Sequence, residues 1–308
     1  MKKVILDCDP GHDDTLAMLL AHAHPSLDLL AVTTVAGNQT LEKVTQNARN
    51  VMTLAGIRKT LLAAGADRPL INEADPGEYI HGVTGLDGYD FPEPAVPVDK
   101  RHAVDLIIDL CHEHGKITLI PTAPLTNIGM AIRKDPAILP KIEEIVLMGG
   151  GNARGNRQPL AEFNIWQDPE AADIVFRCGV PVTMIGLNLT HQAKATPDVV
   201  RRMQALDNEV ARMAVGLIEF FRSTYAKHFR FDAPPIHDAC AVARVIDPEI
   251  VKCEFVNVEM ELKGTYTYGA TVCDMDGITG RKPNANVATV LDREKFWNLM
   301  IEALASYK

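Results

Sequence analysis

The stretch ILDCDPGHDD, residues 5–14, places four aspartates, Asp7, Asp9, Asp13 and Asp14, within eight positions. An apolar run precedes them, and a Pro-Gly pair divides them. Side chains on a strand alternate between its two faces, so Asp7 and Asp9 should share one face at the strand's end. Asp13 and Asp14 then enter the first turn of a helix, where the helix dipole favours anions. The stretch predicts a strand–turn–helix unit with crowded carboxylates at its turn.

Apolar strand patterns and helical patterns alternate along the rest of the chain. Strands are predicted over 3–9, 28–37, 116–121, 142–150 and 181–186, and helices over 13–24, 40–56, 103–114, 125–134 and 168–179. This alternation indicates an α/β fold with a mainly parallel sheet covered by helices on both faces. Ligands bind beyond the carboxyl ends of the strands in such sheets. The aspartate cluster begins at that edge.

The remaining segments complete one predicted domain over residues 1–308. Residues 65–100 are rich in Gly, Pro and Asp and are predicted to form loops, whereas 197–229 are predicted to be helical. Strands and a final helix at 293–307 follow residue 250. No internal repeat, low-complexity tract or clear linker divides the chain, so a single domain is the simpler interpretation.

Composition restricts the class of protein. The 308 residues are 47% hydrophobic with a formal net charge of −9, which argues against binding to nucleic acid or to an anionic membrane. No apolar run is long enough to span a bilayer, and Asp7 and Asp9 interrupt the first run too early for a signal peptide. We therefore expect a cytoplasmic protein. The six cysteines are scattered without a C-x-x-C pair and are predicted to be reduced thiols.

The four neighbouring carboxylates require a counter-charge. The helix dipole contributes only about 0.3–1 kcal/mol per charge, which does not offset this crowding in a partly buried crevice. A bound divalent cation does, and hard oxygen ligands favour Ca²⁺ or Mg²⁺ over zinc. The alternative, in which Asp13 is a helix N-cap and the others are solvated, explains one aspartate more readily than four at one junction.

The motif DCDPGHDD, residues 7–14, resembles the D-x-D-x-x-x-D-D signature of the nucleoside hydrolases, the inosine–uridine-preferring ribohydrolase family. Further blocks resemble that family's in its order: VAGNQT (35–40), IHGVTGLDG (80–88), LIPTAPLTNI (119–128), IVLMGGG (145–151), AEFNIWQDPEAA (161–172) and PPIHDAC (234–240). They span nearly the whole chain. The resemblance implies one Rossmann-like α/β domain with a mixed, mostly parallel sheet. It also implies calcium-dependent hydrolysis of the N-glycosidic bond of ribonucleosides and assembly as a homodimer or homotetramer.

The resemblance also implies roles for individual residues at a calcium site. Asp9 would be both a metal ligand and the general base that activates a metal-bound water. Asp14 would bind Ca²⁺ with both carboxylate oxygens. Thr122 would supply its backbone carbonyl, and Asp238 would arrive from far down the chain.

A second group of residues is implied to bind the small-molecule ribonucleoside substrate. Ribose hydroxyls would be held by Asp13, Asn38, Asn156, Glu162 and Asn164, with Met148 as the floor under the sugar and Phe163 beside it. His81 and His237 would face the nucleobase. His237 is the candidate proton donor to the departing base, because histidine titrates near neutral pH. Tyr225 either stacks on the base or belongs to an apolar helix face, and His12 receives no role beyond shaping the rim.

Two other classes of function compete with this interpretation. A phosphatase of the haloacid dehalogenase type also begins with D-x-D after a first strand, but it leaves Asp13, Asp14 and Asp238 without a role. A non-enzymatic nucleoside- or sugar-binding protein with a structural calcium would have nearly the same residues. Turnover that depends on Asp9, with binding that does not, separates the enzyme from the binding protein.

Overall fold

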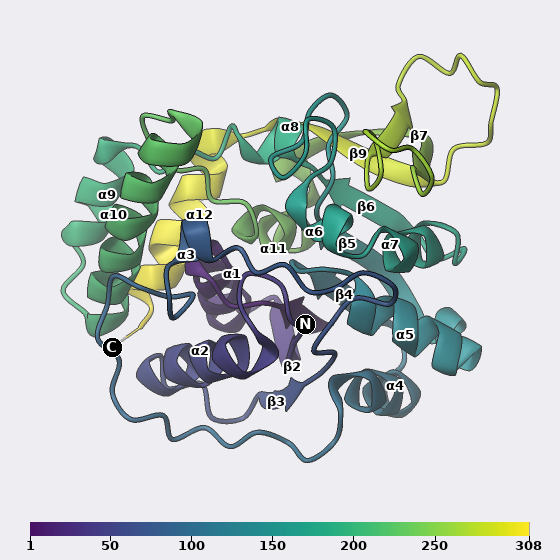
Figure 1. Cartoon of the computed structure of the whole chain (residues 1–308). Helices are drawn as coiled ribbons and strands as arrows, with labels where there is room; N and C mark the ends of the chain where they lie inside the picture. The colour runs from purple at the N-terminus through teal and green to yellow at the C-terminus, as the bar shows by residue number, and fades with distance from the viewer. Residues whose placement is uncertain (308) are drawn as a thin grey trace.

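The structure is a computed structural model, and it describes residues 1–307. Within them it contains the strands β1 Lys2–Cys8, β2 Leu27–Thr34, β3 Leu61–Ala64, β4 Ile117–Pro121, β5 Ile142–Met148, β6 Val182–Ile185, β7 Val251–Met260, β8 Thr271–Asp274 and β9 Ala285–Leu291. They form one nine-stranded sheet in the order β3-β2-β1-β4-β5-β6-β9-β7-β8 (Figure 1). The pairs from β3 to β9 are parallel, and β7 runs antiparallel to both β9 and β8. The predicted mixed, mostly parallel α/β sheet is confirmed.

The helices connect and cover these strands. They are α1 His12–Ala23, α2 Leu41–Leu54, α3 Glu78–His81, α4 Ala103–His114, α5 Thr126–Lys134, α6 Phe163–Gln167, α7 Pro169–Phe176, α8 Leu187–Thr190, α9 Pro197–Gln204, α10 Glu209–Phe229, α11 Ala239–Ile246 and α12 Arg293–Ala305, with 3₁₀ turns at Pro136–Lys141 and Pro248–Ile250. None of the helices in residues 1–307 has both the length and the apolar character needed to cross a membrane.

The alternation of side chains along β1 builds two hydrophobic layers. Val4 and Leu6 pack in one core with α1, α2 and the helices α9 to α12, whereas Ile5 packs in the other with α4, α5 and α7. These helix groups lie on opposite sides of the sheet in Figure 1. Fully burying a side chain of this size contributes about 1.5–3 kcal/mol, so both layers stabilise the strand that carries the aspartate motif.

The connectivity places a crevice at the carboxyl end of β1. The chain proceeds from β1 outward through β2 and β3 and then returns to the other side of β1 as β4. Such a reversal of strand order leaves an opening between the two neighbouring strand ends. Asp7 on β1 pairs with Pro121 on β4, so Asp9 and Thr122 emerge side by side. Helix α11, which packs on α1, begins after Asp238 at the same edge.

Local sequence features account for several details of the fold. Asp168 caps α7 by accepting a hydrogen bond from the backbone N–H of Ala171, with Pro169 in the first turn. Gly56 follows α2 with a φ of 68°, in the left-handed region that favours glycine. The six cysteines are free thiols. Strand β3 was not predicted, because its four residues include no β-branched or aromatic side chain.

Candidate active site

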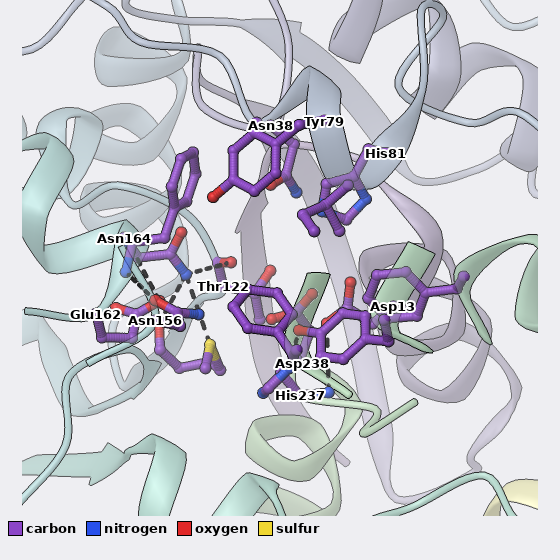
Figure 2. Close-up of a pocket in the computed structure, with 17 residues that line it drawn as sticks. Asp13, Asn38, Tyr79, His81, Thr122, Asn156, Glu162, Asn164, His237 and Asp238 are labelled. Carbon is purple, nitrogen blue, oxygen red and sulfur yellow. Dashed lines mark hydrogen bonds between the residues drawn. The ribbon is translucent and has the colours of Figure 1, made fainter. Parts of the chain in front are cut away.

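A cavity opens at the carboxyl edge of the parallel strands (Figure 2). Its wall combines residues from segments that lie far apart in the sequence. The candidate residues that line it are Asp13, Asn38, His81, Thr122, Met148, Asn156, Glu162, Phe163, Asn164, Tyr225, His237 and Asp238. The two remaining candidates, Asp9 and Asp14, are fully buried next to this wall. The fold thus brings all the predicted site residues to one place.

Three carboxylates, those of Asp13, Asp14 and Asp238, form the acidic end of the cavity. One carboxylate oxygen from each lies within 4.8 Å of the others, and all three side chains are buried. Burial, the largest effect, raises the pKa of Asp13 to about 7 and that of Asp14 to about 6. Burial followed by the charges of Asp13 and Asp14 raises the pKa of Asp238 well above its ordinary range. In residues 1–307 no salt bridge links these groups to a cationic side chain.

Asp9 lies beside this cluster with one oxygen engaged and one free. Its Oδ2 accepts a 2.6 Å hydrogen bond from the backbone N–H of Asn38, whereas no group in residues 1–307 bonds its buried Oδ1. Burial and then the charge of Asp14 raise the pKa of Asp9 well above its ordinary range. A buried carboxylate oxygen without a partner is costly. This oxygen is therefore suited to a cation or a proton donor.

Asp14 is held by contacts from three elements. Its Oδ2 accepts bonds of 3.1 Å from the backbone N–H of Gly11 and from Asn38 Nδ2, and its Oδ1 accepts a 3.0 Å bond from Thr122 Oγ1. The carbonyl of Thr122 in turn accepts a 3.0 Å bond from Asn164 Nδ2. These bonds fix the loop after β4 against the start of α1.

The wall formed by the loop before α6 is also preorganised. Glu162 caps α6: its oxygens accept bonds from the backbone N–H groups of Gly150, Asn164 and Ile165. Asn156 accepts a 2.8 Å bond from the N–H of Phe163. The backbone N–H groups therefore hold the side chains that the resemblance assigned to the ribose, and Glu162 acts first as a local organiser of this wall.

At the opposite wall, both ring nitrogens of His237 are engaged. Thr190 Oγ1 lies 2.7 Å from Nδ1, and the hydroxyl of Tyr225 lies 2.7 Å from Nε2. Burial lowers the pKa of His237 well below its usual value, so the expectation that it titrates near neutral pH does not hold for this environment. Tyr225 lines the cavity and also packs in the core beneath it, so it belongs to an apolar helix face, whereas its stacking on a base stays a prediction.

The structure adds residues that sequence reasoning missed. Tyr79, Ile80, Phe221 and Phe229 line the cavity, and His12, which had received no role, contacts His81. Tyr79 and Ile80 precede His81 directly, so proximity to a candidate was the available signal. Asp7 is not among the residues that line the cavity, and its Oδ1 accepts bonds from Thr33 Oγ1 and Asn127 Nδ2.

Known proteins resemble this chain over its whole length. Residues 4–298 match a family profile described as inosine-uridine preferring nucleoside hydrolase. A protein of that description from Crithidia fasciculata is 49% identical, covering 98% of this chain and 97% of that protein. A pyrimidine-specific ribonucleoside hydrolase, RihB, of Escherichia coli is 43% identical, covering 99% and 98%.

A solved structure supports the same relationship. A purine-preferring ribonucleoside hydrolase from Gardnerella vaginalis has a TM-score of 0.92 and 32% identity, covering 99% of this chain and 98% of that one. These three relatives differ in the base that their names specify. The comparisons therefore agree on the class of reaction and leave the preferred base open.

Proposed function

This chain belongs to the inosine-uridine preferring nucleoside hydrolase family, and on that basis we propose that it hydrolyses the N-glycosidic bond of ribonucleosides to ribose and free base in a calcium-dependent reaction. The observation that carries the proposal is the group of buried carboxylates beside the cavity, with which no cationic side chain in residues 1–307 forms a salt bridge. The family match and the residues that line the cavity both argue against a phosphatase of the haloacid dehalogenase type.

The donor set fits a hard divalent cation. Asp9, Asp14, Asp238 and the carbonyl of Thr122 would hold calcium, because they supply only oxygen ligands. The unbonded Oδ1 of Asp9 supports its assignment as a ligand. Asp14 and Asp238 place carboxylate oxygens within 4.8 Å of each other, which supports their assignment as ligands. Asp13 belongs to the same compact group and lines the cavity, and we assign it to the ribose as the resemblance implies.

The reaction needs a base near the sugar and negative charge around it. When bound, calcium would orient the attacking water and lower its pKa. Asp9 accepts the proton as the water oxygen bonds to the anomeric carbon and the bond from that carbon to the base nitrogen breaks. The sugar passes through an oxocarbenium-like state, and the surrounding carboxylates stabilise its positive charge.

The remaining candidate residues bind the substrate. Asn38, Asn156, Glu162 and Asn164 surround the ribose with Asp13, Phe163 lies beside it and Met148 lies beneath it. Because a missing hydroxyl leaves buried partners unpaired, we expect ribonucleosides to be preferred over deoxyribonucleosides. His81, Tyr225 and His237 form the base end, and the Tyr225–His237 pair is the source of a proton or hydrogen bond for the departing base.

The test is a ribose-release assay across purine and pyrimidine nucleosides, with and without a chelator. We expect release that the chelator abolishes. In the Asp9→Ala variant we expect turnover to be lost while nucleoside binding, measured by calorimetry, largely survives. A wild-type protein that binds inosine or uridine with calcium present and releases no base would instead identify a binding protein.

We also propose that the chain assembles as a homodimer or homotetramer and that residues 1–308 form one domain. The family supports the assembly, and the continuous sheet supports the single domain. Light scattering of the purified protein measures the mass of the particle directly. A monomer at micromolar concentration would refute the assembly and leave the proposed reaction untouched.

A further inference from the structure

His12 links the first helix to the loop that follows α3. Its Nε2 lies 2.7 Å from the backbone carbonyl oxygen of Asp87. A carbonyl oxygen only accepts hydrogen bonds, so Nε2 of His12 carries the hydrogen. A neutral imidazole has one N–H, and therefore Nδ1 of a neutral His12 is bare.

The surroundings keep His12 neutral. The ring is 1% exposed and stacks on Phe220 and Phe221 with centroids 5.1 and 5.2 Å apart. Moving a charged group into such apolar surroundings is unfavourable. The buried position of the ring between aromatic side chains, without an ion pair in residues 1–307, therefore favours the neutral form.

The bare Nδ1 of His12 determines the state of its neighbour. It lies 3.1 Å from Nδ1 of His81, which must then be the donor of the bond between them. His81 is also buried, and burial, the largest effect, lowers its pKa well below the usual value, which favours the neutral ring. With its one hydrogen on Nδ1, His81 has an unprotonated Nε2.

We propose that His12 is a positioning residue that fixes His81 as a hydrogen-bond acceptor for an N–H group of the nucleobase. His81 lines the cavity, on the wall across from Glu162 and Asn164 (Figure 2). No hydrogen bond from residues 1–307 is found at its Nε2, which is therefore available to a ligand. This inference rests on the proposed function for the identity of the ligand.

The substrate class follows from the chemistry of the bases. Uracil and hypoxanthine, once joined to ribose, each carry a single N–H, on the ring. A hydrogen-bond acceptor favours binding of a base that presents this N–H and disfavours an analogue in which a methyl group replaces the hydrogen. Because Nε2 of His81 has no hydrogen, His81 recognises the base and does not protonate it.

Two further contacts hold this arrangement. Backbone N–H groups of Val83 and Thr84 donate to the Asp87 carboxylate, which shapes the loop that presents the Asp87 carbonyl to His12. A Cβ on Gly11 would lie 2.5 Å from Nδ1 of His81, so only glycine at this position leaves room for the ring. The backbone carbonyl of Asp87 thus positions His12, and the missing side chain of Gly11 leaves room for His81.

Two substitutions separate the two bonds of His12. The amide of glutamine reaches the place of Nε2, so His12→Gln keeps the bond to Asp87 and leaves no acceptor opposite His81. The amide of asparagine reaches the place of Nδ1, so His12→Asn keeps an acceptor for His81 and loses the bond to Asp87. A purely structural role for His12 would make the two variants alike in catalysis.

The first measurement is the ¹⁵N spectrum of the ligand-free, calcium-loaded protein labelled at its ten histidines. A ring nitrogen without hydrogen resonates far from one with hydrogen, and a His81→Gln variant identifies the His81 signals. We expect hydrogen on Nδ1 and none on Nε2 of His81 in the wild type and in His12→Asn. In His12→Gln we expect the hydrogen to move, at least in part, to Nε2.

The second measurement is the ratio of kcat/KM for uridine to that for 3-methyluridine, and for inosine to that for 1-methylinosine. We expect both ratios to fall about tenfold in His12→Gln, the typical effect of one buried hydrogen bond, and to change little in His12→Asn.

An Nε2-protonated His81 in the wild type would overturn the inference, and so would equal ratios in the two variants. If neither variant folds, the wild-type spectrum still decides. Absence of base release from every nucleoside would instead refute the proposed function, because the spectrum is recorded without substrate.

Discussion

At the scale of single residues, space beside Asp9 is as important as the charges around it. Gly37 has a φ outside the left-handed region, so its backbone does not require glycine. A Cβ at this position, however, would lie 2.1 Å from Oδ2 of Asp9. The glycine is therefore needed because the carboxylate of the proposed base occupies the place of its missing side chain.

Gly37→Ala should consequently displace the Asp9 carboxylate. We expect kcat/KM for ribonucleosides to fall about 100-fold, since a misplacement of this size disrupts catalytic geometry. Gly77→Ala is the matched control, because its Cβ would meet neighbours only at 3.6 Å, an ordinary contact, in the same cavity. Similar losses in the two variants would contradict this argument.

At the scale of elements, one aspartate ties α7 to two neighbouring segments. Asp168 Oδ1 accepts from the N–H of Ala171, while Oδ2 accepts from the N–H of Leu70 and the hydroxyl of Thr126 on α5. The same side chain therefore caps a helix and anchors the long loop that leads to α3. This loop carries one wall of the cavity.

Asp168→Ala should reduce the free energy of unfolding by about 2–4 kcal/mol, because it removes a cap and leaves two further donors unpaired. Asp292→Ala provides the comparison, since Asp292 caps α12 with a single bond to Lys295 and is exposed. We expect a clearly smaller loss there in urea denaturation. Equal losses would show that the contacts to Leu70 and Thr126 contribute nothing.

At the scale of the whole molecule, the proposed calcium site would link folding to metal binding. The ion would bind the folded state alone, because only the fold assembles ligands from residues 9 to 238. Such binding stabilises by about 2.7 kcal/mol when the ligand exceeds its Kd a hundredfold. Chelation should therefore lower Tm and abolish ribose release together, and Asp168→Ala should keep this response. An unchanged Tm after chelation would exclude a structural share for the ion.

The effect of pH on stability follows from the same groups. Burial raises the pKa of Asp13 from 3.8 to about 7 and that of Asp14 from 3.8 to about 6 in the metal-free protein. At pH values between the ordinary pKa of 3.8 and these raised values, the folded state binds more protons than the unfolded chain. The contribution of these groups to metal-free stability therefore falls as pH rises and levels off above about pH 7.

Calcium requires the deprotonated carboxylates, so its stabilisation should grow over the same interval. We expect the increase in Tm on adding calcium to be larger at about pH 8 than at about pH 5. Differential scanning fluorimetry with and without calcium measures it at each pH. An increase that does not vary with pH would mean that Asp14 is not a calcium ligand.

The sequence by itself determined the α/β class, because alternating apolar patterns are local and the strand β1 and helix α1 lie within one short stretch. It also located the acidic turn, and the resemblance supplied the distant partner Asp238 that no local pattern indicates. The strand β3 and the helix α6 remained undetected, since β3 contains no β-branched or aromatic side chain and the five residues of α6 make little more than one helical turn.

Only the tertiary structure decided which side chains meet. His12 and His81 are 69 residues apart, and Asp13 accepts a bond from the N–H of His237, 224 residues away. The direction of a side chain and the packing between distant elements depend on the whole fold, so no spacing rule yields them. The lowered pKa of His237 likewise follows from burial, a property of the assembled core.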